Sequence, residues 1–119
     1  MSSPSPALRR GARLFLTGGT GFVGRSLLKF LKESTNGLEN IRTTVLTRNP
    51  GHFAVRYPEL ARGIEMLRGD VRDFTWPKME FSHVIHAAAD TGANAPGRPR
   101  ELVETIIDGT ARVLDFALL

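Results

Sequence analysis

Three glycines at intervals of three residues, Gly18, Gly21 and Gly24, follow a short apolar segment at residues 13–17. A chain that turns sharply from a strand into a helix, admits a diphosphate to its backbone and packs the helix on the strand needs glycine at these positions. Free backbone N–H groups and the positive end of the helix dipole would then face the anion. The spacing therefore predicts a pyrophosphate-binding loop, in which Gly18 makes the turn, Gly21 leaves room for the phosphates and Gly24 lets the helix approach the strand.

Two other interpretations compete for this loop. One is an ordinary glycine-rich loop with no ligand. The other is a P-loop of the form G-x-x-x-x-G-K-[ST], because Gly19, Gly24, Arg25 and Ser26 come within one residue of that pattern. Arg25 stands where the P-loop has a lysine, and a guanidinium is a poor replacement for a compact ammonium beside the terminal phosphates. The P-loop is therefore disfavoured. The rest of the chain decides between a pyrophosphate-binding loop and an ordinary glycine-rich loop.

The apolar pattern alternates between strand and helix along the chain. Short apolar and β-branched runs predict strands at 13–17, 41–47, 64–68 and 82–88. Apolar residues at helical spacing predict helices from residue 23 to an Asn36-Gly37 stop, at 53–62, and from residue 102 to the end. This alternation predicts an α/β fold of the Rossmann type: a partial doubly wound parallel sheet with strand order 3-2-1-4 and helices on both faces.

Polar and small residues stand at the carboxyl ends of the predicted strands, where ligands of doubly wound sheets bind. Asp70 follows the third strand, and the alanines at 87–89 follow the fourth. Arg48 and Asn49 follow the second strand. An acidic residue there would bind the ribose 2′-hydroxyl of NAD and repel a 2′-phosphate. Arg48 therefore favours NADP over NAD, unless it is simply a solvated loop charge.

The composition predicts one small domain that does not enter a membrane. The 119 residues suffice for one core but not two, and the absence of cysteine excludes disulfides and cysteine-type zinc sites. Residues 1–11 lack the apolar centre of a signal peptide and are expected to form a disordered leader before a domain at 12–119. The net charge is +4, but the arginines are scattered along the chain and aromatic residues are few. Nucleic-acid binding is therefore not predicted. We expect a cytoplasmic protein without a metal site.

Four motifs occur in a fixed order: TGGTGFVG at 17–24, GDVRD at 69–73, HAAA at 86–89 and IDGT at 107–110. In this order and spacing they resemble the motif series of the extended short-chain dehydrogenase/reductases. Within these, the chain most resembles the NAD-dependent epimerase/dehydratase group that acts on nucleotide sugars. The resemblance extends over residues 13–119. It implies a nicotinamide dinucleotide, NAD or NADP, as cofactor and a nucleotide sugar as substrate.

The resemblance also implies roles for single residues. Backbone N–H groups of Phe22 and Val23 would bind the pyrophosphate, Asp70 with Val71 would contact the adenine, and the alanines at 87–89 would line the nicotinamide ribose. The implied cofactor-binding residues are Gly18, Thr20, Gly21, Phe22, Val23, Gly24, Arg48, Asn49, Asp70, Val71, Ala87, Ala88 and Ala89. Asp70 can instead be a plain turn-forming residue. His83 and His86 can be hydrogen-bonded residues of the core.

The chain departs from the family's pattern at two places. Ile106 stands where the family usually has an asparagine, and isoleucine cannot make the hydrogen bonds of an amide. The family's catalytic Tyr-x-x-x-Lys pair is also missing, because the only tyrosine, Tyr57, has Ala61 four residues later. No catalytic residue is therefore assigned in this chain.

We expect the chain to be the cofactor-binding, N-terminal part of a nucleotide-sugar epimerase or dehydratase, truncated before a fifth strand and the catalytic half and inactive on its own. Two alternatives stay open: a stand-alone NAD(P)-binding or sensing module, and an NADPH-dependent reductase of the extended family, which Arg48 would suit. Without a fifth strand, the edge of the strand at 82–88 and the apolar face of the last helix would be exposed. Self-association of the chain is therefore expected.

Overall fold

The computed structural model describes residues 11–18, 21–34, 41–87 and 99–118. Its elements, in chain order, are β1 (Arg13–Thr17), α1 (Phe22–Ser34), β2 (Arg42–Thr47), α2 (Pro50–Arg56), α3 (Pro58–Ala61), β3 (Glu65–Arg68), β4 (His83–His86) and α4 (Pro99–Ala117). Strands and helices alternate as predicted up to β3, except that two short helices replace one between β2 and β3. β4 follows β3 with no helix in the described residues between them.

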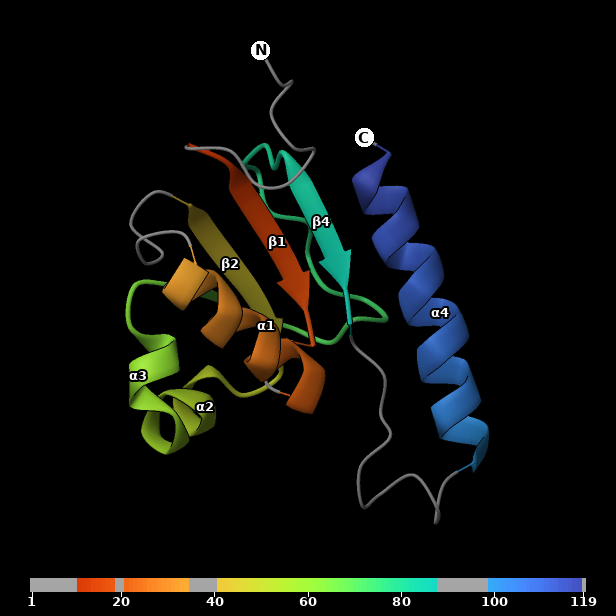
Figure 1. Ribbon diagram of the computed structural model, residues 1–119. Helices are drawn as coiled ribbons and strands as arrows, with labels where there is room; N and C mark the ends of the chain where they lie inside the picture. Colours follow the sequence, from red (N-terminus) through yellow and green to blue (C-terminus); the bar gives the residue numbers. More distant parts are fainter. Residues whose placement is uncertain (1–10, 19–20, 35–40, 88–98, 119) are drawn as a thin grey trace.

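The four strands form one parallel sheet in the order β3-β2-β1-β4 (Figure 1). Leu16 of β1 aligns with Val45 of β2 on one side and with Ile85 of β4 on the other. The predicted fold class and the strand order 3-2-1-4 are confirmed. Because the strands are parallel, their carboxyl ends meet at one edge of the sheet, and the loops that follow them gather there.

Helices cover both faces of the sheet. Alternate residues of β1 point to opposite faces, so neighbouring residues of this strand pack against different helices. Leu16 is fully buried in a cluster with Leu28 of α1 and Phe53 of α2. Phe15 is fully buried on the other face, where its ring lies 5.6 Å from that of Phe74 and 4.9 Å from that of Phe116 in α4. Figure 1 shows α1, α2 and α3 grouped together and α4 apart from them. The prediction of helices on both faces is confirmed.

The segment predicted as one helix at 53–62 is two helices with a break at Tyr57. α2 begins at Pro50, because the Asn49 side-chain oxygen accepts a hydrogen bond from the His52 N–H at 3.0 Å and proline suits the first turn. Pro58 has no N–H to continue the helix, and it disfavours helical backbone at Tyr57, whose φ and ψ are −131° and 64°. The prediction of a continuous helix is therefore wrong.

Other boundaries differ from the prediction by a few residues. β4 ends at His86 rather than at residue 88, and α4 begins at Pro99 rather than at residue 102. The predicted leader up to residue 10, the Asn36-Gly37 stop and most of the loop at 90–99 lie outside the described residues. None of the helices within the described ranges is both long and apolar enough to cross a membrane.

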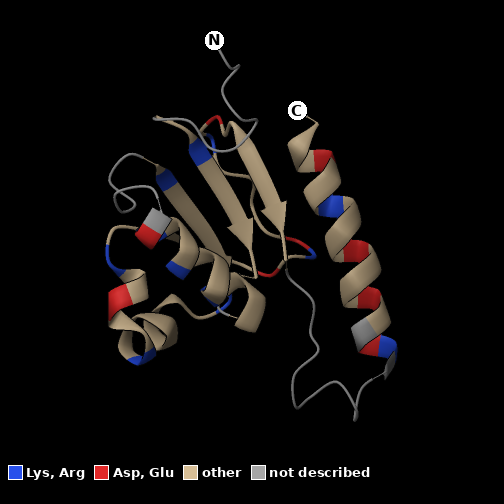
Figure 2. Ribbon diagram, in the orientation of Figure 1, with Lys and Arg blue, Asp and Glu red and all other residues tan. Residues whose placement is uncertain are grey.

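Charge differs between the helices on the two faces. α1 carries three basic residues and one acidic residue, FVGRSLLKFLKES. α4 carries four acidic residues and two basic ones, PRELVETIIDGTARVLDFA. Figure 2 shows this contrast, with red segments repeated along α4. An anionic ligand is therefore favoured on the α1 side of the sheet rather than along α4.

Candidate dinucleotide-binding site

The chain leaves β1 at Gly18, which turns it toward α1. Gly18 has a φ of +76°, a left-handed conformation that glycine adopts without the strain of a Cβ atom. Its carbonyl oxygen accepts a hydrogen bond from the Gly21 N–H at 3.1 Å, and the Gly21 carbonyl accepts one from the Arg25 N–H at 2.9 Å. The turn at Gly18 thus leads directly into the first turn of α1.

Gly21 borders open space. Among the described residues, a Cβ atom added at Gly21 would meet only the Gly18 carbonyl oxygen, at 3.6 Å, which is an ordinary contact. Gly24 is buried, whereas Phe22 and Val23 leave 78% and 65% of their surface exposed beside the loop. Packing within the described chain therefore does not require glycine at position 21, but a ligand close to the backbone would. Thr20 lies outside the described residues.

Asp70, which follows β3, organises a turn and is fixed by Arg72. Its carboxylate accepts hydrogen bonds from the Arg72 backbone N–H at 2.9 Å, from Nε at 3.0 Å and from Nη2 at 2.8 Å. Its carbonyl oxygen accepts from the N–H groups of Asp73 and Phe74. The hydrogen bonds from Arg72 hold the pKa of Asp70 below its ordinary value, and the charge of Arg48 adds a smaller effect. Asp70 therefore forms the turn after β3, and its carboxylate is ionised at neutral pH.

Val71 joins this turn to α4. Its side chain is buried in the cluster that contains Phe15 and Phe116. A Cβ atom added at Gly109 of α4 would lie only 2.7 Å from a methyl carbon of Val71. The missing side chain of Gly109 thus lets α4 approach the turn closely, and the helix holds in place the loop that presents Asp70.

Ala87 directly follows β4 and lies beside the end of β1. Its N–H donates to the Thr17 carbonyl oxygen at 3.1 Å and lies 3.2 Å from the Thr17 hydroxyl oxygen. The chain therefore brings Ala87 next to the residue that precedes the glycine loop. Ala88 and Ala89 lie outside the described residues.

His86 connects three elements through hydrogen bonds. Its Nδ1 lies 2.6 Å from the hydroxyl of Thr17 in β1, and its Nε2 lies 3.2 Å from the hydroxyl of Thr110 in α4. Burial lowers the pKa of His86 below its ordinary value, so the imidazole is neutral at pH 7. The hydrogen bonds expected of His86 are therefore present, but the residue is half-buried and does not belong to the buried core. His83 is half-buried, and its Nδ1 lies 2.9 Å from the Ser82 hydroxyl.

We expect His86 to make the stability of the chain depend on pH. In the unfolded chain this histidine binds a proton at its ordinary pKa of about 6.5, whereas in the folded chain it does so only at lower pH. Acid therefore favours the unfolded state between the two values. His86→Gln should be about 1 kcal/mol less stable at pH 7, yet lose less stability than the parent chain on acidification. Urea unfolding at a series of pH values measures this, and equal losses in both proteins would contradict it.

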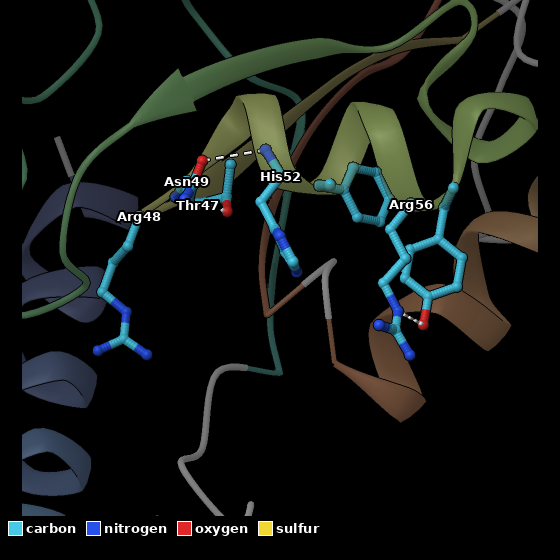
Figure 3. Close-up of a pocket in the computed structure, with 7 residues that line it drawn as sticks. Thr47, Arg48, Asn49, His52 and Arg56 are labelled. Atoms are coloured by element: carbon cyan, nitrogen blue, oxygen red, sulfur yellow. Dashed lines mark hydrogen bonds between the residues drawn. The ribbon is translucent and has the colours of Figure 1, made fainter.

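A pocket of about 270 Å³ lies at the carboxyl end of β2 beside α2. It is lined by Thr47, Arg48, Asn49, His52, Phe53, Arg56 and Tyr57. Figure 3 shows the side chains of Arg48, His52 and Arg56 extending from α2 and the segment before it toward the same open side. The charge of the pocket comes from Arg48 and Arg56, because its lining contains no lysine or carboxylate. The side-chain oxygen of Asn49 caps α2.

Tyr57, at the break between α2 and α3, holds two arginines. Its phenol oxygen accepts hydrogen bonds from Nη1 of Arg25 and from Nε of Arg56, the latter at 3.1 Å. The Arg25 guanidinium also lies over the Tyr57 ring, 4.6 Å from its centre. The hydrogen bond from Arg56 and the charges of both arginines lower the pKa of Tyr57. Because Arg25 is in the first turn of α1, Tyr57 links the glycine loop to the pocket.

Four residues of this region were not predicted as parts of a ligand site: Arg25, His52, Arg56 and Tyr57. Arg48, His52 and Arg56 are spaced by four residues, the spacing that puts side chains on one face of a helix. That signal was available, but a helix start placed at residue 53 concealed it. The contact of Arg25 with Tyr57 joins residues 32 positions apart, and no local sequence pattern predicts it.

Residues 14–118 match the model of the NAD dependent epimerase/dehydratase family. The match spans most of the chain, so the chain belongs to this family, and the resemblance inferred from its motifs is confirmed. Membership implies a nicotinamide dinucleotide as cofactor.

The chain is similar to parts of longer proteins. UDP-glucuronate 4-epimerase 3 of Arabidopsis thaliana is 30% identical over 96% of this chain, which spans 28% of that protein. The structure of Pen from Bacillus thuringiensis matches 91% of this chain with a TM-score of 0.71 and 28% identity, over 34% of its own length. ADP-L-glycero-D-manno-heptose-6-epimerase of Helicobacter pylori shares the fold, with a TM-score of 0.61, 21% identity and coverage of 91% of this chain and 36% of that one.

Proposed function

We propose that this chain binds NAD or NADP at the carboxyl edge of its sheet, as the cofactor-binding part of an epimerase- or dehydratase-type oxidoreductase. The observation that carries the proposal is the turn at Gly18, which leads from the central strand β1 into α1. In a doubly wound sheet, a glycine loop between the first strand and its helix is where a dinucleotide pyrophosphate binds. Membership of an NAD dependent family supports the same class of cofactor.

Each part of the cofactor has proposed neighbours in the chain. The N–H groups of Phe22 and Val23 would donate to the pyrophosphate, and the alanines from 87 to 89 would line the nicotinamide ribose. The adenine amine would donate to Asp70, whose carboxylate it would share with Arg72. When bound, the nicotinamide supplies hydride transfer. The only tyrosine of the chain holds arginines rather than a lysine, so we assign a cofactor site and no catalytic acid–base pair to these residues.

The proposed substrate of the longer protein is a nucleotide sugar. This rests on the family and on a relative that is named a UDP-glucuronate 4-epimerase, of which the chain spans 28%. Arg48 favours a second candidate, an NADPH-dependent reductase that exchanges its cofactor after each turnover. A stand-alone NAD(P)-binding module is the third. A Tyr-x-x-x-Lys pair encoded beyond residue 119 would favour either enzyme over the module, and its absence would favour the module.

Calorimetric titration with ADP-ribose, NAD and NADP tests the proposed cofactor site. ADP-ribose contains the pyrophosphate and both riboses without the nicotinamide, so it should bind wherever the glycine loop and the adenine site are formed. The proposal fails if none of the three ligands binds to a chain whose circular dichroism shows that it is folded.

Arg48 is proposed to select NADP. A guanidinium paired with the 2′-phosphate contributes about 1.5–3 kcal/mol, or about tenfold to a hundredfold in affinity. Arg48→Ala should therefore weaken NADP binding by that factor and leave NAD binding nearly unchanged, as measured by calorimetry. Equal affinities of the parent chain for NAD and NADP would show that Arg48 is only a solvated loop charge.

We also propose that the chain associates with a second copy through the outer face of α4. Val103, Ile107 and Leu114 lie along one stripe of this helix, Leu118 directly follows its end, and all four are between 52% and 82% exposed. Among the described strands, β4 pairs with β1 alone, so its other edge is also available. Leu114→Asp should reduce the mass measured by light scattering across a concentration series, whereas Phe30→Asp on α1 should not. A parent chain that stays monomeric at high concentration contradicts the proposal.

A further inference from the structure

Thr17 and His86 are the last aligned pair of β1 and β4, and their side chains are bonded to each other. In the parallel register, Thr17 lies opposite His86. The Thr17 hydroxyl oxygen is 2.6 Å from His86 Nδ1, and the Ala87 N–H donates to the Thr17 carbonyl oxygen at 3.1 Å. After this pair the chain continues into the glycine loop on one side and into the segment that starts at Ala87 on the other. The pair is therefore the last tie between the two strands among the described residues.

This tie lies at the point where the direction of the sheet reverses. In the order β3-β2-β1-β4, the chain runs outward from β1 to β2 and β3 on one side and places β4 on the other. The space beyond the carboxyl ends of β1 and β4 is therefore the switch point, where a doubly wound sheet binds a dinucleotide. The spacing of the two segments that border this space depends on how the strand ends are held.

α4 holds the pair from one face of the sheet. His86 Nε2 lies 3.2 Å from the hydroxyl of Thr110 in α4, the helix that Figure 1 shows beside β4. The neighbouring Gly109 is buried, and a Cβ atom there would lie only 2.7 Å from a methyl carbon of Val71. Val113, one turn beyond Gly109, is buried in the core. Because the helix is packed so closely here, Thr110 is a fixed anchor for the imidazole.

A neutral imidazole satisfies both of these contacts at once, since it has one N–H donor and one acceptor nitrogen. The Ala87 N–H also approaches the Thr17 hydroxyl oxygen, at 3.2 Å, which makes that oxygen an acceptor. Its own hydrogen is then best donated to His86 Nδ1, so that the imidazole proton stays on Nε2 and is donated to Thr110. The bonds thus form one continuous chain from Ala87 through Thr17 and His86 to Thr110.

We propose that His86 and Thr110 are positioning residues for the nicotinamide half of the cofactor. Through Thr17 they fix the distance between the glycine loop and the segment from Ala87 that would line the nicotinamide ribose. The inference rests on the proposed dinucleotide site and adds to it two residues that need not touch the ligand. The adenine is proposed to bind at Asp70, after β3, which β2 separates from β1. The bridge should therefore affect one half of the cofactor and not the other.

Two ligands that differ by the ribose on the nicotinamide side test the proposal: ADP and ADP-ribose. Thr110→Val replaces a hydroxyl by a methyl group and keeps the β-branched shape. In calorimetric titrations it should weaken ADP-ribose binding by about threefold to tenfold, the worth of one hydrogen bond, and change ADP binding by less than about twofold. Thr110→Ser restores the hydroxyl and should restore the affinity for ADP-ribose. Unchanged ADP-ribose affinity in a folded Thr110→Val chain would overturn the proposal.

His86→Gln tests the other link of the bridge. The glutamine amide can still reach Thr110, but the side chain has no nitrogen at the Nδ1 position to accept from Thr17. This variant should therefore show the same selective loss of ADP-ribose affinity. Combining it with Thr110→Val should add little, because the two bonds act as parts of one chain. Fully additive losses would mean that His86 and Thr110 act independently, against the proposal.

Thr43→Val provides the matched control. Thr43 is buried on β2, and its hydroxyl has no hydrogen-bond partner among the described residues. The same exchange of hydroxyl for methyl is made in the same sheet but outside the bridge, so both ligands should bind as they do to the parent chain. A selective loss of ADP-ribose affinity in this variant would show that the effect does not depend on the bridge, and would overturn the inference.

The remaining outcomes separate this inference from the proposed function. If Thr110→Val weakens ADP and ADP-ribose equally, the bridge supports the fold as a whole, so the inference is wrong and the dinucleotide site stands. If the folded parent chain binds neither ADP-ribose nor NAD nor NADP, the proposed function fails, and the inference fails with it.

Discussion

Replacing Gly21 with valine is expected to reduce dinucleotide affinity by at least a hundredfold while the chain stays folded. The added Cβ would meet the Gly18 carbonyl oxygen at an ordinary 3.6 Å, so the described fold accepts it. The branched side chain would occupy the space proposed for the pyrophosphate. Loss of two charge-assisted hydrogen bonds of about 1.5–3 kcal/mol each accounts for this effect. Calorimetry with NADP and thermal unfolding measure the two parts of the prediction.

Two further variants make the Gly21 result specific. Gly21→Ala introduces a smaller side chain and should give an intermediate loss of affinity. Ser26→Val places the same valine at an exposed position of α1, one turn beyond the loop, and should leave binding within about twofold of the parent chain. A folded Gly21→Val chain that binds NADP like the parent would rule out the glycine loop as the pyrophosphate site.

Gly109→Val is expected to destabilise the chain by about 2–3 kcal/mol. Its Cβ would lie 2.7 Å and 3.3 Å from the two methyl carbons of Val71, and the stiff β-branched side chain of Val71 has little freedom to move aside. Removing a helical glycine gains only a few tenths of a kcal/mol, which does not offset the clash. The melting temperature should fall by roughly 8 °C or more.

The clash at Gly109 can be separated from other effects of the substitution. Ala111→Val introduces valine at an exposed site of the same helix and should change the melting temperature little. Val71→Ala removes the two clashing methyl groups, so the double variant Gly109→Val, Val71→Ala should be more stable than the sum of the single effects predicts. Strictly additive effects would mean that α4 does not approach the turn as described.

The sheet was predictable from sequence because each buried parallel strand is a short apolar run between segments of helical spacing. β1 lies within 13–17, and β2, β3 and β4 fall within the predicted runs. The strand order followed from that alternation together with the glycine loop, since a doubly wound sheet places its first strand between the second and the fourth. The errors are confined to the ends of the predicted runs. Ser82, for example, was assigned to a strand but lies just before β4.

The region between β2 and β3 was not predictable by periodicity alone. Asn49-Pro50 is a helix-start signal that also reads as a turn, and the choice of the turn moved the predicted helix to residue 53. With α2 starting at Pro50, the spacing of Arg48, His52 and Arg56 would have shown a basic face beside the end of β2. An N-cap depends on one side-chain hydrogen bond, which sequence alone does not reveal.

Contacts between distant residues account for what else escaped prediction. The bond between Arg25 and Tyr57 depends on how α1 packs beside α2, and that between His86 and Thr110 depends on how α4 covers β4. From the sequence, Tyr57 could be compared only with the catalytic Tyr-x-x-x-Lys pair, and it was set aside because no lysine stands four residues later. Its actual partners are arginines from two different helices.

Backbone amide NMR during a titration with NADP tests the central claim most directly. We expect the amide resonances of Gly18, Gly21, Phe22 and Val23 to shift with one common dissociation constant, because these residues form the loop at which the pyrophosphate is proposed to bind. Resonances at the opposite edge of the sheet, such as those of Arg13 and Arg42, should stay unchanged. Unshifted glycine-loop amides at saturating NADP, or shifts confined to another surface, would contradict a dinucleotide site at the end of β1.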